Sequence, residues 1–277
     1  MHITTLGIDV AKNVFQLHGV DARGRAVLSR RVTRSQLVDA VASLPPCVIG
    51  MEACGSAHHW GRAFEQLGHT VKLMSPKYVR PYVKTNKNDG RDAEAICEAV
   101  SRPTMRFVSI KTVEQADMQA LHRTRSLFVK HRTAVINQIR GLLAEYGLVI
   151  AQSPEKVRPA LVRFLDNAEA GLTACARDTF SELYEQLQEL DARIERVTHR
   201  VERVYRAHPV CRKLAAVPGI GPLTATALLA TVVGPRRFTT DGIWRPGWVW
   251  CLGNIPVGAR SAWAGFRNAA VGMCGRS

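Results

Sequence analysis

The stretch ITTLGIDV, residues 3–10, is an apolar run that carries a single carboxylate, Asp9, near its end. A short apolar run of this kind is typical of a buried β-strand. Desolvating a carboxylate in such a strand is costly unless a cation or hydrogen-bond donors compensate the charge. We therefore predict that Asp9 is the first ligand of a divalent-metal site.

Three further acids complete this candidate site. Glu52 follows the apolar run VIGM, and Asp89 and Asp92 lie one helical turn apart at the start of an expected helix. Each acid also has a simpler explanation. Asp9 could be a buried acid whose hydrogen bonds are satisfied, and Glu52 an exposed strand end. Asp89 and Asp92 could be acids favoured by the dipole at a helix start. Together, Asp9, Glu52, Asp89 and Asp92 supply the oxygen ligands that a pair of Mg²⁺ ions needs. We expect all four to be metal-ligating and catalytic residues.

Strand and helix signals alternate along the first hundred residues. Strands are expected at 3–10, 14–20, 26–32, 47–51 and 70–74, and helices at 35–44, 55–67, 76–83 and 89–101. Ser35 is the expected N-cap of the first helix, and residues 86–88 form a polar linker. This order predicts an α/β fold, in which a mixed sheet carries helices on its faces. We assign it to a domain of residues 1–108.

A helical region follows at residues 109–208. Its first long stretch, 113–146, is basic, and its second carries apolar residues at alternating spacings of four and three: Leu183, Leu187, Leu190, Ile194, Val197, Val201 and Val204. Such a heptad seam is typical of a coiled coil. Pairing between chains and an intramolecular hairpin with the 113–146 helix would both satisfy the seam, and periodicity does not separate them.

Residues 209–240 form the next predicted segment, whose centre matches the helix-hairpin-helix pattern. Pro218, Gly219, Ile220 and Gly221 lie between two expected helices. The glycines permit a tight turn, and the free N–H groups of the second helix can hold a phosphate. The simpler alternative is an ordinary Pro-Gly turn. The basic charge of the chain favours contact with the DNA backbone.

Charge and composition narrow the class of partner. A net charge of +15 and a pI of about 10.0 favour polyanions, with nucleic acid ahead of an anionic membrane. No apolar run approaches the roughly 18 residues of a membrane span, and the N-terminus lacks a signal-peptide pattern. Seven scattered cysteines without a C-x-x-C pair indicate reduced thiols in a cytoplasmic protein rather than a structural zinc site.

Several motifs resemble those of one enzyme family, the DEDD transposases of insertion-sequence family one-ten. The resemblance is carried by GIDVAK at 7–12, MEACG at 51–55, KNDGRDA at 87–93, VPGIGP at 217–222 and RRF at 236–238. It implies a RuvC-like (RNase H-like) N-terminal domain and magnesium-dependent cleavage and transfer of DNA strands. Asp9, Glu52, Asp89 and Asp92 match the four acids of the family.

The same resemblance implies partners and a location. The family acts on DNA selected by a structured bridge RNA, and it assembles as dimers or tetramers through a coiled coil. Arg236 and Arg237 join the expected DNA-binding residues. The expected location is the bacterial cytoplasm, in association with the nucleoid.

The tail, residues 241–277, departs from the family pattern. It holds four of the five tryptophans and, after Asp241, no acid and no lysine. The family pattern continues instead with Ala-Trp-Leu-Gly-Leu-Val-Pro and then with Ser-Ser-Gly-Gly-Lys, which carries a nucleophilic serine. Residues 245–258 can be read through permitted codons, in another frame, as Ala-Trp-Val-Gly-Leu-Val-Pro-Arg-Gln-Tyr-Ser-Ser-Gly-Gly.

We therefore expect a frameshift between about residues 239 and 242. This would make the chain a truncated, inactive copy that has lost the nucleophilic serine. Ser261 lies near the expected place but is not the family serine.

Two other function classes stay open. A non-catalytic DNA-binding or dimerising remnant would fit a copy without its serine. An actin-like or sugar-kinase fold also begins with a G-I-D strand. That fold needs a glycine and a Thr or Ser just after the Asp, and Val10-Ala11-Lys12 supplies neither.

Overall fold

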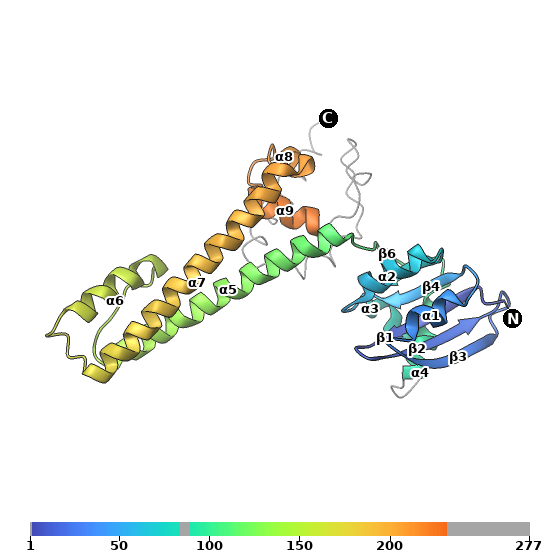
Figure 1. Cartoon of the computed structure of the whole chain (residues 1–277), viewed down its shortest axis with the longest axis horizontal. Coiled ribbons are helices and arrows are strands. Elements are labelled where there is room, and N and C mark those ends of the chain that lie inside the picture. Colours follow the sequence, from blue (N-terminus) through green and yellow to red (C-terminus); the bar gives the residue numbers. More distant parts are fainter. Residues whose placement is uncertain (1, 84–88, 232–277) are drawn as a thin grey trace. The chain divides into compact units, whose positions relative to one another are not determined.

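The chain forms two compact units in the computed structural model, which describes residues 2–83 and 89–231 (Figure 1). The sheet unit extends to Thr112, and the helical unit begins at Val113. The predicted domain boundaries stay predictions. Residues 209–231 pack in the helical unit, against its two long helices.

A six-stranded sheet with the strand order β3-β2-β1-β4-β5-β6 is the centre of the sheet unit. Its strands are β1 Thr5–Val10, β2 Val14–Val20, β3 Ala26–Thr33, β4 Val48–Glu52, β5 Thr70–Met74 and β6 Phe107–Val108. The first three strands form an antiparallel meander, β4 and β5 run parallel to β1, and β6 returns antiparallel to β5. The predicted mixed sheet with flanking helices is therefore confirmed.

Five helical segments accompany the sheet: α1 Leu37–Ala42, α2 Ala57–Gln66, α3 Pro76–Val79, the 3-10 helix η1 Arg80–Tyr82, and α4 Asp89–Val100. Ser35 is not the N-cap of α1, contrary to the sequence prediction. The Gln36 side chain accepts hydrogen bonds from the backbone N–H and the hydroxyl of Thr33, and α1 starts only at Leu37. The expected linker at residues 86–88 lies outside the described residues.

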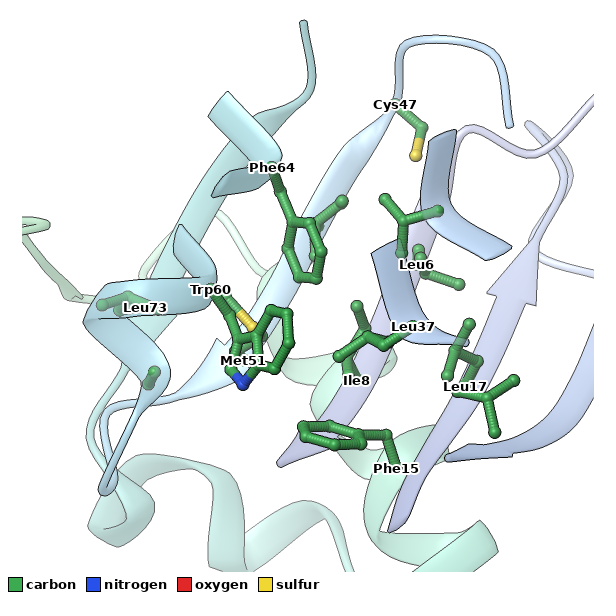
Figure 2. Close-up of a cluster of buried hydrophobic side chains, with 14 of the residues drawn as sticks. Leu6, Ile8, Phe15, Leu17, Leu37, Cys47, Met51, Trp60, Phe64 and Leu73 are labelled. Atoms are coloured by element: carbon green, nitrogen blue, oxygen red, sulfur yellow. The ribbon is translucent and has the colours of Figure 1, made fainter. Parts of the chain in front are cut away.

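One face of the sheet is covered by α1 and α2. Figure 2 shows Leu6 and Ile8 of β1 packed with Leu37 of α1 and with Trp60 and Phe64 of α2. Side chains alternate between the two faces of a strand, so this apolar set leaves residues 7 and 9 on the opposite face.

The opposite face is covered by α4, which comes into backbone contact with the sheet. A Cβ added at Gly7 would lie 2.3 Å from the carbonyl oxygen of Ala93 and 2.7 Å from the backbone nitrogen of Cys97. A Cβ at Gly50, the neighbour of Gly7 across β1 and β4, would lie 2.9 Å from the Cβ of Val100. Both glycines are therefore needed for α4 to lie this close to the strands.

The helical unit contains α5 Val113–Ala144, the 3-10 helix η2 Pro154–Lys156, α6 Val157–Asp166, α7 Ala174–Ala207, α8 Pro209–Leu214 and α9 Pro222–Thr231. Figure 1 shows α5 and α7 side by side and antiparallel. Five residues of the predicted seam are buried: Leu187, Leu190, Ile194, Val197 and Val201. The intramolecular hairpin, one of the two alternatives, therefore accounts for the seam, and a coiled coil between chains stays a prediction.

Polar contacts join α5, α6 and α7 to one another and join α9 to α5. Asp191 of α7 forms ion pairs with Arg132 of α5, at 3.0 Å, and with Arg158 of α6. In the first half of α5, a hydrogen bond joins α5 to α9 between the buried residues His122 and Thr226, 3.0 Å from Nε2 to Oγ1. No helix in the described ranges is long and apolar enough to cross a membrane.

Replacing Gly7 with Ala should lower the free energy of unfolding by about 1–3 kcal/mol, because the new methyl group would overlap the backbone of α4. Gly141→Ala is the control, since a Cβ there meets nothing within 4 Å. That change in α5 should stabilise the protein by about 0.5–1 kcal/mol. Urea denaturation followed by circular dichroism measures both effects. An unchanged midpoint for Gly7→Ala would contradict the close approach of α4.

A second prediction concerns His122, whose pKa is lowered from 6.5 to about 4 by burial and by the nearby charge of Arg125. Between these values only the unfolded chain binds the proton. The contribution of neutral His122 to stability is therefore complete above pH 6.5 and falls as the pH drops towards 4, by at most about 3 kcal/mol. Urea midpoints at pH 7 and pH 5 should differ less for His122→Gln than for the parent. Exposed His199→Gln is the control, and equal pH dependence in all three proteins would refute the assignment.

Candidate functional site

The structure brings Asp9 and Glu52 to neighbouring positions. The parallel strands β1 and β4 pair in register up to Ile8 and Met51, and the two acids are the next residue of each strand. Paired strands lie about 4.8 Å apart, and both acids follow a glycine by two residues, on the face that α4 covers. Both side chains are half-buried.

The direction of α4 brings its first turn towards the same place. Cys97 lies near the start of β1, with its thiol 3.8 Å from the carbonyl oxygen of Thr5, whereas Ala93 lies over Gly7. The helix therefore runs opposite to β1. Asp9 is two strand residues beyond Gly7, about 6.6 Å, and the start of α4 is four helix residues before Ala93, about 6 Å. The first turn of α4 is thus level with Asp9.

The other two predicted acids belong to this first turn. Asp89 is the first residue of α4, and its side chain is outside the description. Asp92 is half-buried and directly precedes Ala93. Among the side chains that the structure describes, no group of three or more His, Cys, Asp or Glu residues could hold a metal ion. The four-ligand metal site stays a prediction.

Cys54 is a neighbour of the two acids that sequence reasoning missed. Burial raises the pKa of its thiol, and the negative charges of Glu52 and, to a smaller extent, Asp9 raise this pKa further. The two carboxylates therefore act electrostatically on the same point. A negative potential of this kind attracts a cation. Cys54 lies two residues after Glu52 in the sequence, and this spacing could have predicted that the thiol lies near the acids.

The loop after Glu52 is fixed by backbone contacts. The N–H of Ala53 donates to the carbonyl of Met74 at 2.7 Å, and the N–H of Cys54 donates to the carbonyl of Glu52 at 2.8 Å. Ser56, at the N-cap of α2, has a φ of 67°, a conformation that costs a non-glycine residue about 1 kcal/mol or more. These constraints hold the end of β4, and with it the backbone of Glu52, in one position.

The predicted DNA-binding turn lies in the helical unit, between α8 and α9. Pro218, Gly219 and Gly221 are exposed, and Gly219 has a φ of 85°, which favours glycine. Ile220 is 8% exposed and packs against Cys211 and neighbouring apolar residues. The turn between two helices is present, and its role in DNA binding stays a prediction.

Several predicted features lie outside the described residues. They are Arg236, Arg237, the whole tail at 241–277 and, within that tail, Ser261. The expected loss of the nucleophilic serine therefore concerns a part of the chain whose structure is not described.

Among solved structures, the chain is similar to the one titled "T. thermophilus RuvC in complex with Holliday junction substrate". It covers 39% of this chain and 100% of that chain, at 13% identity and a TM-score of 0.31. A TM-score this low supports no conclusion about this chain.

Comparisons of sequence are more informative. The chain is 45% identical over 241 residues to a "probable family 20 transposase" of Pseudomonas aeruginosa, covering 87% of this chain and 71% of that protein. It is 46% identical over 236 residues to the transposase for insertion sequence element IS1111A of Coxiella burnetii, covering 85% and 65%. It is 39% identical over 248 residues to the transposase for insertion sequence element IS1328 of Yersinia enterocolitica, covering 85% and 70%.

A family model of IS110-type DEDD transposases, described as "Transposase", matches residues 6–148. The match includes most of β1 and all of β4, α4 and α5. It therefore contains all four predicted acids. The chain belongs to the DEDD transposase family of insertion sequence IS110.

Proposed function

We propose that the chain derives from a DNA recombinase that cleaves and transfers strands of its insertion sequence at Asp9, Glu52, Asp89 and Asp92. The observation that carries this proposal is the adjacent position of Asp9 and Glu52, below the helix that begins with Asp89. Half-buried carboxylates at adjacent strand ends repel each other and favour a bound cation. The membership of a transposase family makes DNA the substrate class.

The chemistry of the donors fits magnesium. All four side chains offer carboxylate oxygens, which hard cations prefer, and the described part of the site adds no histidine or thiolate ligand. Asp9 and Glu52 are fixed by strand pairing, and Asp92 by the contact between α4 and the sheet. We propose two Mg²⁺ ions, which when bound would polarise a phosphate and stabilise the charge that develops on its oxygens.

The roles of the chain's own residues follow from their positions. The carboxylates would hold the cations, which would position the scissile phosphate, and the strand ends keep the carboxylates in place. The basic surface holds the DNA backbone. We also propose the turn at Pro218, Gly219, Ile220 and Gly221, together with Arg236 and Arg237, as contacts for DNA phosphates.

Partners and assembly complete the proposal. A structured RNA of the element would select donor and target DNA, as the family resemblance implies. Dimers or tetramers would form through α7, and the protein would act on the nucleoid of a bacterial cell. The alternative is a DNA-binding remnant without catalysis, and a metal-dependent cleavage assay on branched DNA separates the two.

Replacing Asp9 with Asn should remove most of the magnesium affinity, with a loss of more than about tenfold, since one ligand charge disappears. The fold should stay intact or gain slightly in stability, because like charges no longer repel. Isothermal titration calorimetry with MgCl₂ measures the affinity. Asp39→Asn, an exposed acid of α1, is the control and should leave it unchanged. Unaltered magnesium binding in Asp9→Asn would overturn the site.

We further propose that this copy has lost the nucleophilic serine through a frameshift in its tail. Support comes from the Trp-rich, acid-free composition of residues 242–277 and from the alternative reading of residues 245–258. The matches to relatives leave 13–15% of this chain unmatched, a share similar to that of the tail.

A one-base correction near codon 240 should therefore restore strand transfer. The corrected chain regains Ser-Ser-Gly-Gly and with it a hydroxyl that can attack beside the metal-binding acids. The assay measures recombination between the element's ends with its flanking RNA present, and compares the corrected chain with the parent. Equal recombination by the two proteins would show that neither the frameshift nor the loss of the serine is real.

A further inference from the structure

The helical unit has a groove between α5 and α7, with a volume of about 610 Å³. Phe128 of α5 lines one side, and residues between 193 and 203 of α7 line the other. Phe128 is half-buried and Val197 is 8% exposed, so the floor of the groove is apolar. We call it the arginine groove, after the four arginines that line it.

The four arginines form a stripe along α7. Arg193, Arg196, Arg200 and Arg203 are spaced three, four and three residues apart, which places them on one side of the helix, next to the buried seam. All four side chains are exposed. With a rise of about 1.5 Å per residue, the stripe is about 15 Å long.

Among the described residues, most of these arginines have no acidic partner. Arg193 pairs with Glu189 at 3.0 Å. Within the described part of the chain, no carboxylate forms an ion pair with Arg196, Arg200 or Arg203. Three exposed cations therefore lie beside an apolar floor with no counter-charge from residues 2–83 and 89–231.

The acids of the same part of α7 lie on a different stripe. Glu195 and Glu202 contact His199 at 3.6 and 3.9 Å, and Glu202 also contacts Arg206 at 3.6 Å. Positions 195, 199, 202 and 206 are again spaced four, three and four residues apart. Glu195 and Glu202 therefore contact His199, which also lines the groove, and Glu202 contacts Arg206, but within the described ranges no ion pair joins either acid to the arginines of the groove.

The basic character is also local along the groove between the two helices. The neighbouring hollow, of about 380 Å³, is lined by His131 and Val135 of α5 and by Glu189 and Leu190 of α7, with Arg193 at the shared end. It carries an acid and no unpaired stripe of arginines. The described arginines of this stripe that have no acidic partner therefore line the arginine groove and not the neighbouring hollow.

The geometry points to a ligand with regularly spaced negative charges and a flat apolar group. A stripe of about 15 Å spans a few consecutive phosphates of one nucleic-acid strand. Aromatic side chains beside a basic groove stack on exposed bases, which only an unpaired strand presents. Arginine also binds phosphate in a bidentate way that lysine does not.

We propose that the arginine groove binds a single-stranded segment of nucleic acid, with phosphates on Arg196, Arg200 and Arg203 and a base against Phe128. The proposal deepens the proposed function and rests on it for the class of partner. It assigns to the hairpin a binding site whose residues are distinct from the acids of the sheet unit. RNA and DNA strands share the required chemistry, and the experiment distinguishes them.

The test uses the full chain and labelled oligonucleotides of one sequence, as single-stranded RNA, single-stranded DNA and duplex DNA. Fluorescence anisotropy in EDTA gives the dissociation constants, so cleavage plays no part. Arg196→Ala, Arg200→Ala and Arg203→Ala are combined in one variant. The control combines Arg23→Ala, Arg30→Ala and Arg31→Ala, three exposed arginines of the sheet unit, which removes the same charge.

The groove variant should bind single strands at least tenfold more weakly than the parent, and the control less than threefold. The slope of log K against log salt should decrease by about 2, because three phosphate contacts are lost at about 0.7 each. A separate variant, Phe128→Leu, should weaken binding of single strands while leaving duplex binding unchanged. Loss confined to the RNA or to the DNA strand identifies the natural source.

Three results would overturn the proposal. One is an equal loss in the groove variant and the control, which would mean that binding depends on total charge alone. Another is a loss confined to duplex DNA. The third is competition by poly-glutamate as effective as that by unlabelled single strands, which would indicate an acidic polypeptide site. A failure here leaves the acids untouched, since magnesium binding by the groove variant, measured by calorimetry, reports on the proposed catalytic function separately.

Discussion

Backbone contact between α4 and β1 at Gly7 determines the geometry of the sheet unit. Because no side chain separates them, the helix is held at a distance that the strand itself dictates. The same contact fixes the height of the first turn of α4 relative to the strand ends. The relative position of Asp92, Asp9 and Glu52 therefore depends on two residues, Gly7 and Gly50, that carry no chemistry of their own.

The helical unit obeys a different constraint, the burial of one apolar seam. The seam of α7 needs a partner helix, and α5 supplies it within the chain. Asp191 then binds Arg132 of α5 and Arg158 of α6, so that one carboxylate fixes the register of the hairpin and the position of the adjoining helix. The side of α7 that does not pack against α5 is exposed and carries the charged residues.

Much of the sheet unit could be predicted because its signals are local. Turn residues and apolar alternation located all the longer strands, and the acids at the ends of two of them predicted a shared site. The approach of α4 was not predicted, although G-x-D and G-x-E repeat the same spacing in β1 and β4, because a glycine in a strand gives no indication of what packs on it. The sequence could not show which helix packs on the seam or which charged residues face the arginine groove. Both depend on contacts between residues that are far apart in the chain. Ser35 is not the cap because α1 begins only at Leu37, after a turn in which the Gln36 side chain accepts hydrogen bonds from Thr33.

The length of the hairpin has a further consequence. Its helices contain 32 and 34 residues, which corresponds to about 48 and 51 Å. The two helices pack against each other along the chain, with α6 on one half of the pair and α9 on the other half (Figure 1). One turn of duplex DNA measures about 35 Å. The hairpin is therefore longer than one turn of duplex, and if nucleic acid binds along it as we propose, contacts near its two ends would fall more than one turn apart.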